Sequence, residues 1–134
     1  MISRLTQDLD FQSQALVLRA ERQRLIAGNI ANADTPGYKA RDFDFASALR
    51  AATGAAGTGE SIAQGVMGDG SSSGLPPVLR YAVPAQTSLD NNSVDMDRER
   101  SAFADNSVKY EATLRFINAS VRTTMDAMKS YHQA

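Results

Sequence analysis

The feature of this sequence that most constrains its fold is a seven-residue repeat of apolar side chains near the C-terminus. Two neighbouring positions of the repeat are filled, one by Met96, Phe103, Tyr110, Ile117, Thr124 and Tyr131, and the other by Ser107, Leu114, Val121 and Met128. Such a pair of positions, held over about five heptads, is typical of a coiled coil. The sequence therefore predicts a long helix over residues 93–134 with one side packed against another helix.

The N-terminal residues 1–34 predict a second long helix, which carries apolar side chains on two sides. The first stripe contains Ile2, Leu9, Leu16 and Ile30, with Leu5 and Ile26 beside it, and the second contains Phe11, Leu18 and Leu25. The stripes lie roughly 160–200° apart around the helix. A helix buried on one side needs only one stripe, so two stripes indicate partners on two sides. Pro36 and Gly37 end this helix.

The middle of the chain is poor in signals for regular structure. Residues 35–53 form a turn and an extended segment, in which 38–50 begin extended and finish as a short helix. Residues 54–74 hold seven of the nine glycines and predict a flexible Gly/Ser-rich insert, and 75–92 predict an extended segment. We therefore expect an all-α fold: long N- and C-terminal helices paired as a coiled coil in one domain, either parallel or antiparallel, joined by a mostly irregular, partly flexible middle segment.

The sequence contains no convincing site for catalysis or for a cofactor. There is no cysteine, and the only histidine, His132, lies where helix ends fray. Residues 65–70 have the glycines of a phosphate loop but not its Lys-Ser/Thr, and 90–95 resemble an acidic calcium loop without its glycine and distal Glu. A net charge of -1 argues against binding to nucleic acid. We predict no enzyme, no cofactor, no metal site and no transmembrane segment.

The two apolar stripes lead to separate expectations for contacts within the chain and between chains. A helix pair covers one stripe of each helix, and a remaining exposed stripe usually marks an interaction site. The seam within the chain is expected at Leu9, Leu16, Ile30, Phe103, Tyr110, Leu114, Ile117, Val121 and Met128. Contacts between subunits are expected at Phe11, Leu18, Leu25, Asn32, Thr35, Pro36, Gly37 and Tyr38. Periodicity alone allows the two sets to be exchanged.

Residues 27–39 resemble the N-terminal signature of the bacterial flagellar axial proteins. They read Ala-Gly-Asn-Ile-Ala-Asn-Ala-Asp-Thr-Pro-Gly-Tyr-Lys, which fits the family pattern of roughly N-x-A-N-x-x-T-x-G-Y. The continuation Ala-Arg-Asp-Phe-Asp-Phe over 40–45, together with residues 81–110, narrows the resemblance to the proteins of the proximal rod. The similar stretches cover roughly residues 5–50 and 80–130 of the chain.

This resemblance implies a function that the residue spacing alone does not. Proteins of this family are structural components of the flagellar basal body, exported by the flagellar type III apparatus without a cleaved signal. In the periplasm they assemble into a hollow, torque-transmitting shaft that is also the export channel. The implied partners are further copies, FlgC-like and other proximal rod subunits, a FliE-like adaptor, and components of the export gate and membrane ring.

A different class of function fits the helix pair equally well. A cytoplasmic coiled-coil chaperone or adaptor of a type III export system would show the same periodicity. The signature after the first helix and the rod-like stretch before the second disfavour it. Location separates the two, because a chaperone stays in the cytosol whereas a rod subunit fractionates with basal bodies.

Overall fold

The structure, a computed structural model, describes residues 2–54, 78–81 and 89–132. In chain order, its elements are α1 (Ile2–Ala31), β1 (Arg41–Phe43), α2 (Phe45–Ala52), β2 (Leu79–Tyr81) and α3 (Met96–His132). At 1.5 Å per residue, α1 and α3 are about 45 and 55 Å long. The predicted insert of residues 54–74 lies outside the described residues except for Gly54, as do residues 75–77 and 82–88 of the predicted extended segment.

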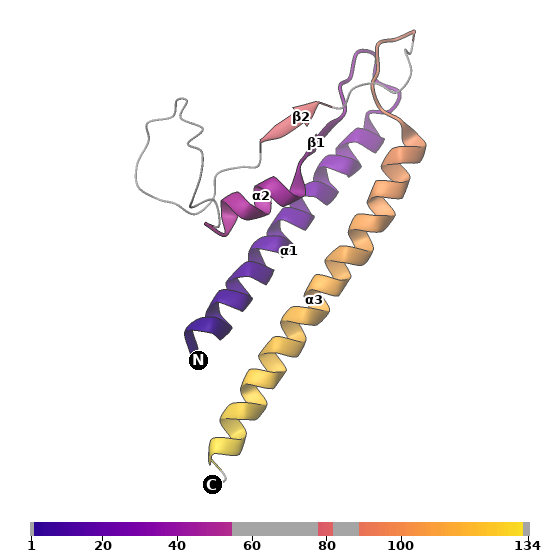
Figure 1. Cartoon of the computed structure of the whole chain (residues 1–134). Helices are drawn as coiled ribbons and strands as arrows, with labels where there is room; N and C mark the ends of the chain where they lie inside the picture. Colours follow the sequence, from indigo (N-terminus) through magenta and orange to yellow (C-terminus); the bar gives the residue numbers. More distant parts are fainter. Residues whose placement is uncertain (1, 55–77, 82–88, 133–134) are drawn as a thin grey trace.

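Helices α1 and α3 lie side by side and run in opposite directions, as Figure 1 shows. The register is fixed by hydrogen bonds between their side chains, from Asn29 to Glu99 and from Gln23 to Ser107. At the closed end of this hairpin, which we define as residues 29–41 and 89–99, the chain leaves the end of α1 and later returns to the start of α3. The N- and C-termini both lie at the opposite, open end (Figure 1). The predicted all-α class, with its two long paired terminal helices, is confirmed.

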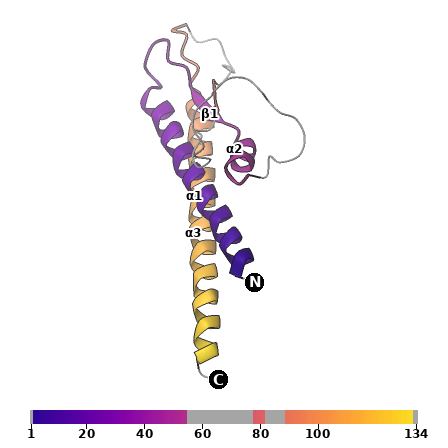
Figure 2. The same ribbon diagram turned by 90° about the vertical axis from the view of Figure 1, so that its left-hand side faces the viewer.

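The two long helices do not stay equally close along their length. In Figure 1, α1 lies closer to α3 near the closed end than toward its N-terminus, and Figure 2 shows that the two helices cross at an angle. The last turns of α3 extend beyond the start of α1. In this part of α3, Val121, Met125 and Met128 are 40%, 53% and 61% exposed. The C-terminal half of α3 therefore has apolar side chains that α1 does not cover.

A small layer made by β1, β2 and α2 lies against the side of α1 that faces away from α3 (Figure 1). Strands β1 and β2 pair antiparallel, with Asp42 opposite Arg80. Asp44 caps the start of helix α2, and its carboxylate accepts hydrogen bonds from the amides of Ala46 and Ser47. An extended stretch followed by a short helix was predicted here. The two-stranded sheet was not, because three-residue strands carry too little periodicity to be recognised.

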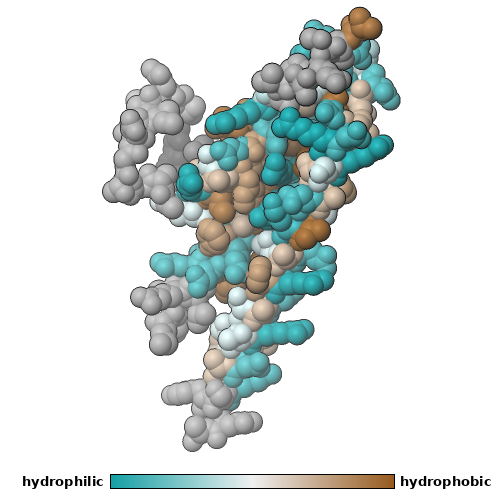
Figure 3. All heavy atoms as spheres, turned by 45° about the vertical axis from the view of Figure 1, so that its right-hand side comes forward, coloured by the Kyte–Doolittle hydropathy of each residue, from teal (hydrophilic) through white to brown (hydrophobic). Residues whose placement is uncertain are grey.

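The hydrophobic core is small and lies where this layer meets α1. Its buried apolar residues are Ala15, Leu18, Ile26, Ala40 and Phe43. On the face shown in Figure 3, hydrophobic side chains gather in the half of the molecule nearer the closed end. The lower part of the same face is mainly hydrophilic or neutral in colour. Within the single chain, apolar burial thus stabilises mainly the half near the closed end.

Replacing Ile26 with Ala tests this distribution of stability. Ile26 is 2% exposed, so Ile26→Ala removes buried methyl groups and leaves a cavity. We expect a loss of about 2–5 kcal/mol in the free energy of unfolding, measured by urea denaturation of the full chain. The control is Val17→Ala on the same helix, where the side chain is 63% exposed and the expected change is below about 0.5 kcal/mol. Equal losses in the two variants would contradict a core centred on Ile26.

Candidate functional site

The C-terminus of α1 continues into a tight turn built from the residues that carry the flagellar resemblance. The side-chain amide of Asn32 donates to the carbonyl of Gly28 at 2.8 Å, and the Thr35 amide donates to the Asn32 carbonyl at 3.1 Å. Gly37 has a φ of 72°, and a Cβ at this position would meet nothing within 4 Å. Glycine is therefore favoured here by backbone conformation and not by lack of space.

Asn92, which precedes α3, holds the turn that follows α1. The buried carbonyl groups of such a turn have no partner in a helix and need one from elsewhere. The side-chain nitrogen of Asn92, with two hydrogens to share, lies within hydrogen-bonding distance of the carbonyls of Asn32 at 3.0 Å, Ala33 at 2.8 Å and Thr35 at 2.8 Å. Asn92 is 7% exposed, so water does not substitute easily for these bonds. A residue about sixty positions away thus fixes the turn at the end of α1.

The backbone of the signature turn is tied directly to the segment that leads into α3. The Gly37 amide donates to the Asp90 carbonyl at 2.9 Å, and the Ser93 amide donates to the Tyr38 carbonyl at 3.0 Å. The Ser93 hydroxyl oxygen in turn accepts a hydrogen bond from the Ala40 amide at 2.8 Å. These bonds run in both directions between the two segments, so the closed end is a cross-linked unit and not a loose connection.

Asn29, at the centre of the closed end, uses all its hydrogen-bonding capacity. Its side-chain nitrogen donates to the Arg41 carbonyl at 2.9 Å and to Glu99 Oε2 at 3.1 Å. Its side-chain oxygen accepts from the Arg41 amide at 3.0 Å and from the Tyr38 hydroxyl at 3.3 Å. Asn29 is 1% exposed. One amide group therefore joins α1, the signature turn, β1 and α3.

Of the two carboxylates near this amide, Asp42 has a cationic partner and Glu99 has none among the ion pairs of the described residues. Arg22 of α1 makes a two-pronged contact with Asp42 of β1, at 3.1 Å and 2.9 Å. Glu99 is 8% exposed and has no cationic partner among the ion pairs of the described residues. Burial raises the pKa of the Glu99 carboxyl group, the hydrogen bond from Asn29 partly offsets this, and the neighbouring carboxylate of Asp42 raises the pKa further.

The residues expected in the seam differ in how far the chain itself covers them. Leu9, Leu16, Ile30, Tyr110 and Ile117 are half-buried. Phe103, Leu114, Val121 and Met128 are 40%, 36%, 40% and 61% exposed. The position filled by residues 114, 121 and 128 therefore lies on the edge of the α1–α3 contact, turned toward solvent. Helical geometry explains this, because one residue of rotation, about 100°, separates that line from the one facing α1.

The line of α3 that does face α1 is polar. Glu99, Asn106 and Thr113 are all buried and are spaced seven residues apart. Asn106 donates to the Arg19 carbonyl at 2.9 Å and to the Gln23 side-chain oxygen at 2.6 Å. The apolar repeat predicts an apolar seam, so these polar residues were not expected at the contact. Their own seven-residue spacing is nevertheless visible in the sequence. Buried polar residues at such positions fix helix register at a cost in stability.

The residues expected at subunit contacts also fall into two groups. Phe11 is 49% exposed, and Thr35, Pro36 and Gly37 are exposed, whereas Leu25, Asn32 and Tyr38 are half-buried. Leu18 is only 7% exposed. It lies one turn before Arg22 on the face of α1 that meets β1, where Arg22 binds Asp42. The chain's own β1 and α2 thus occupy part of the second stripe, which periodicity assigned to another subunit.

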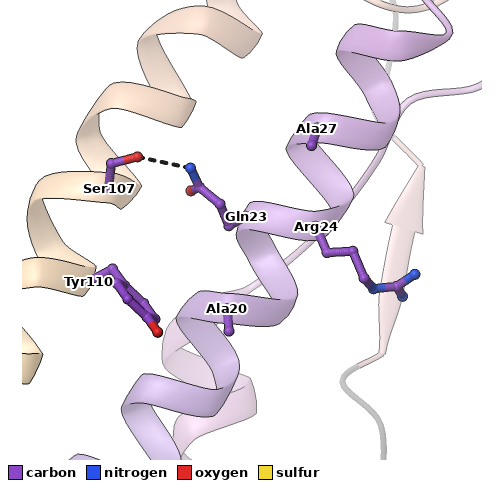
Figure 4. A pocket seen from close by; sticks show the side chains of 6 residues that line it. All are labelled: Ala20, Gln23, Arg24, Ala27, Ser107 and Tyr110. Carbon is purple, nitrogen blue, oxygen red and sulfur yellow. Dashed lines mark hydrogen bonds between the residues drawn. The ribbon is translucent and has the colours of Figure 1, made fainter.

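A groove of about 400 Å³ runs along one flank of the contact between α1 and α3. Figure 4 shows Ala20, Gln23, Arg24 and Ala27 of α1 and Ser107 and Tyr110 of α3 along it. The Gln23 side chain donates to the Ser107 hydroxyl from α1 to α3 at 2.8 Å (Figure 4). Alanines on one wall and the half-buried Tyr110 on the other make the groove shallow and partly apolar. Its chemistry suits contact with another helix and includes no nucleophile–base pair.

Among the described residues, no three His, Cys, Asp or Glu side chains come close enough to hold a metal ion. In the same part of the chain, no helix has both the length and the apolar character needed to cross a membrane. The geometry of the described residues is therefore that of a long helical hairpin with one fastened end and exposed apolar lines along its flanks.

Comparisons with known proteins agree with this geometry. Residues 9–39, which comprise most of α1 and the signature turn, match the family model described as "Flagella basal body rod protein". The chain is 46% identical over 135 residues to the flagellar basal body rod protein FlgB of Proteus mirabilis, covering 96% of this chain and 98% of that protein. It is 44% identical over 139 residues to the FlgB of Escherichia coli K12, covering 97% and 99%. It is 40% identical over 121 residues to that of Cereibacter sphaeroides, covering 90% and 93%.

Removing the amide of Asn92 tests its role at the end of α1. Asn92→Ala leaves carbonyls of Asn32, Ala33 and Thr35 without this donor. We expect a loss on the order of 2 kcal/mol in the free energy of unfolding of the full chain, and faster exchange of the hydrogen-bonded amides of Thr35, Gly37 and Tyr38 in the turn after α1. Asn118→Ala, at an exposed position of α3, is the control and should change little. Unchanged amide exchange in this turn in Asn92→Ala would refute the role of Asn92.

Proposed function

Because this chain belongs to the FlgB family of flagellar basal body rod proteins and is a structural component of the rod, we propose that it builds the rod through the apolar lines its hairpin leaves uncovered. The observation that carries this proposal is the match to FlgB proteins along almost the whole chain, 96% in the Proteus mirabilis case. The hairpin supplies the geometry: a long double helix, closed at one end, whose apolar flanks need neighbours.

The uncovered apolar surface lies mainly on α3. Its exposed large hydrophobic side chains are Phe103, Val108, Leu114, Phe116, Val121, Met125 and Met128, whereas α1 contributes Phe11 and Val17. We therefore place Leu114, Val121 and Met128 at subunit contacts together with Phe11 and the turn of residues 35–37. Leu9, Leu16, Ile30, Tyr110 and Ile117 form the half-buried part of the seam within the chain.

In this proposal, one line of side chains on α3 stabilises the folded subunit and another line makes the contacts between subunits. The polar line of Glu99, Asn106 and Thr113 sets the register of the hairpin within one subunit. The apolar line of Leu114, Val121 and Met128 contributes roughly 1.5–3 kcal/mol per side chain once a neighbour buries it. Assembly thereby adds the apolar burial that the single chain lacks. Repeated around a shaft, such contacts provide the stiffness that torque transmission requires.

The neighbours and the location follow from the family. We place the chain in the periplasmic part of the basal body, exported by the flagellar type III apparatus without a cleaved signal. Its neighbours are further copies, FlgC-like and other proximal rod subunits, a FliE-like adaptor, and components of the export gate and membrane ring. A cytoplasmic export chaperone, the alternative that the helix pair allows, has no support in the comparisons.

Mass spectrometry of purified hook–basal bodies tests the location. Peptides of this chain are expected there at a few copies per structure, and they should stay with the basal body after washing in high salt. The cytosolic fraction of the same cells is the control. Enrichment in the cytosol together with absence from basal bodies would overturn the rod assignment and favour the chaperone.

Introducing a charge into the apolar line of α3 tests the contact. Leu114 is 36% exposed in the single chain, so Leu114→Asp should change the stability of the chain by less than about 1.5 kcal/mol. Within an assembled contact the same carboxylate would be buried without a partner, which is far more costly. We expect loss of motility and of rod assembly, with export retained. Ala119→Asp, which is exposed and lies on the same face of α3 as the charged Arg115 and Arg122, is the matched control. Normal motility of Leu114→Asp would refute this contact.

A further inference from the structure

Glu99 is buried in a place where an ionised carboxylate is poorly accommodated. It is 8% exposed, and the hydrogen bond that its Oε2 accepts at 3.1 Å comes from the neutral amide of Asn29. Asn29 cannot rotate to donate a second hydrogen bond to Glu99, because its other hydrogen-bonding positions are taken by the Arg41 backbone and the Tyr38 hydroxyl. The site is therefore rigid as well as buried.

The charged groups around Glu99 do not neutralise it. From β1, Asp42 adds a like charge, and its own partner Arg22 of α1 is engaged in two hydrogen bonds to Asp42. Asp95, which precedes α3, adds a second like charge, and Arg98 of α3 attracts the carboxylate only weakly from an exposed position. Removing the charge on Glu99 relieves both its desolvation and its repulsion from two neighbouring carboxylates.

We propose that Glu99 makes the stability of the closed end depend on pH. When its carboxyl group is protonated, the contacts among α1, β1 and α3 are more stable, and when it is ionised they are less stable. The contacts involved join Asn29, Arg41 and Glu99, which come from the three elements. The inference rests on the geometry of the closed end and does not depend on the rod assignment.

The direction of the pH effect follows from linkage. Burial raises the pKa of Glu99 in the folded chain above its ordinary value of 4.5, so the folded chain binds a proton more readily than the unfolded chain. The stabilisation from protonation is fully present below the ordinary value and is lost as the pH rises through the raised pKa. Mild acid thus strengthens the closed end, whereas most buried, salt-bridged carboxylates weaken a fold in acid.

The test compares thermal unfolding of the full chain with that of Glu99→Gln and Glu111→Gln between pH 5 and pH 8. Glutamine mimics the neutral carboxyl group at every pH. Glu111 lies on the same helix but is exposed and paired with Arg115, so it reports on surface charge alone. We expect the midpoints of the wild type and Glu111→Gln to fall by several degrees as the pH rises. Glu99→Gln should keep a higher midpoint at pH 8 than the wild type.

A second measurement does not depend on how any variant folds. Nuclear magnetic resonance of the side-chain carboxyl carbons in the wild-type chain should show Glu99 titrating above its ordinary pKa of 4.5. The amide of Arg41, which donates to Asn29, should show greater protection from exchange at pH 5 than at pH 8 after correction for intrinsic rates. Parallel pH profiles of Glu99→Gln and Glu111→Gln, or titration of Glu99 at or below its ordinary value, would overturn the proposal.

Discussion

The saturated side-chain amide of Asn29 is the interaction on which the geometry of the hairpin depends. Its four hydrogen bonds reach the backbone of β1, the hydroxyl of Tyr38 and the carboxyl group of Glu99. Because no capacity is left over, the amide has one favourable orientation, and that orientation fixes where β1 and α3 lie against α1. Asn92 adds a second constraint by holding the turn after α1 from the segment that leads into α3. The polar contacts at this end therefore align the two long helices.

Much of the helical architecture could be predicted from the sequence, because the repeat from Met96 to Met128 and the apolar stripes of the first helix are long. The orientation of α3 around its own axis could not. Leu114 and Thr113 are adjacent, and hydrophobicity favours burying Leu114, yet Thr113 is buried and Leu114 is 36% exposed. The seven-residue repeat identifies an apolar line but not the partner that covers it. In the single chain, the partner helix α1 meets the polar line instead.

At the candidate site, the contacts that could not be predicted join residues that lie far apart in the sequence. The resemblance in residues 27–39 was visible, but its physical basis was not, since Asn92 and Glu99 contact that segment from about 60 and 70 residues away. Leu18 is a further example. Its place in the second stripe of α1 suggested a contact with another subunit, whereas the residues after the turn fold back and bury it. Pairing between the three-residue strands β1 and β2 leaves no periodic trace from which that return could be inferred.

The separation along the chain between the groups that meet at the closed end sets the order in which the fold can form. The amide of Asn29 and the carboxyl group of Glu99 are 70 residues apart, and the amide of Asn92 is 60 residues from the carbonyl it caps. Closing so long a loop has an entropic cost that only the complete set of contacts offsets. A chain that passes a narrow opening from its N-terminus first therefore cannot fasten its hairpin until most of its length is through. The chain topology alone therefore delays formation of the closed end. The subunit reaches its final structure only after α3 is available to pair with α1.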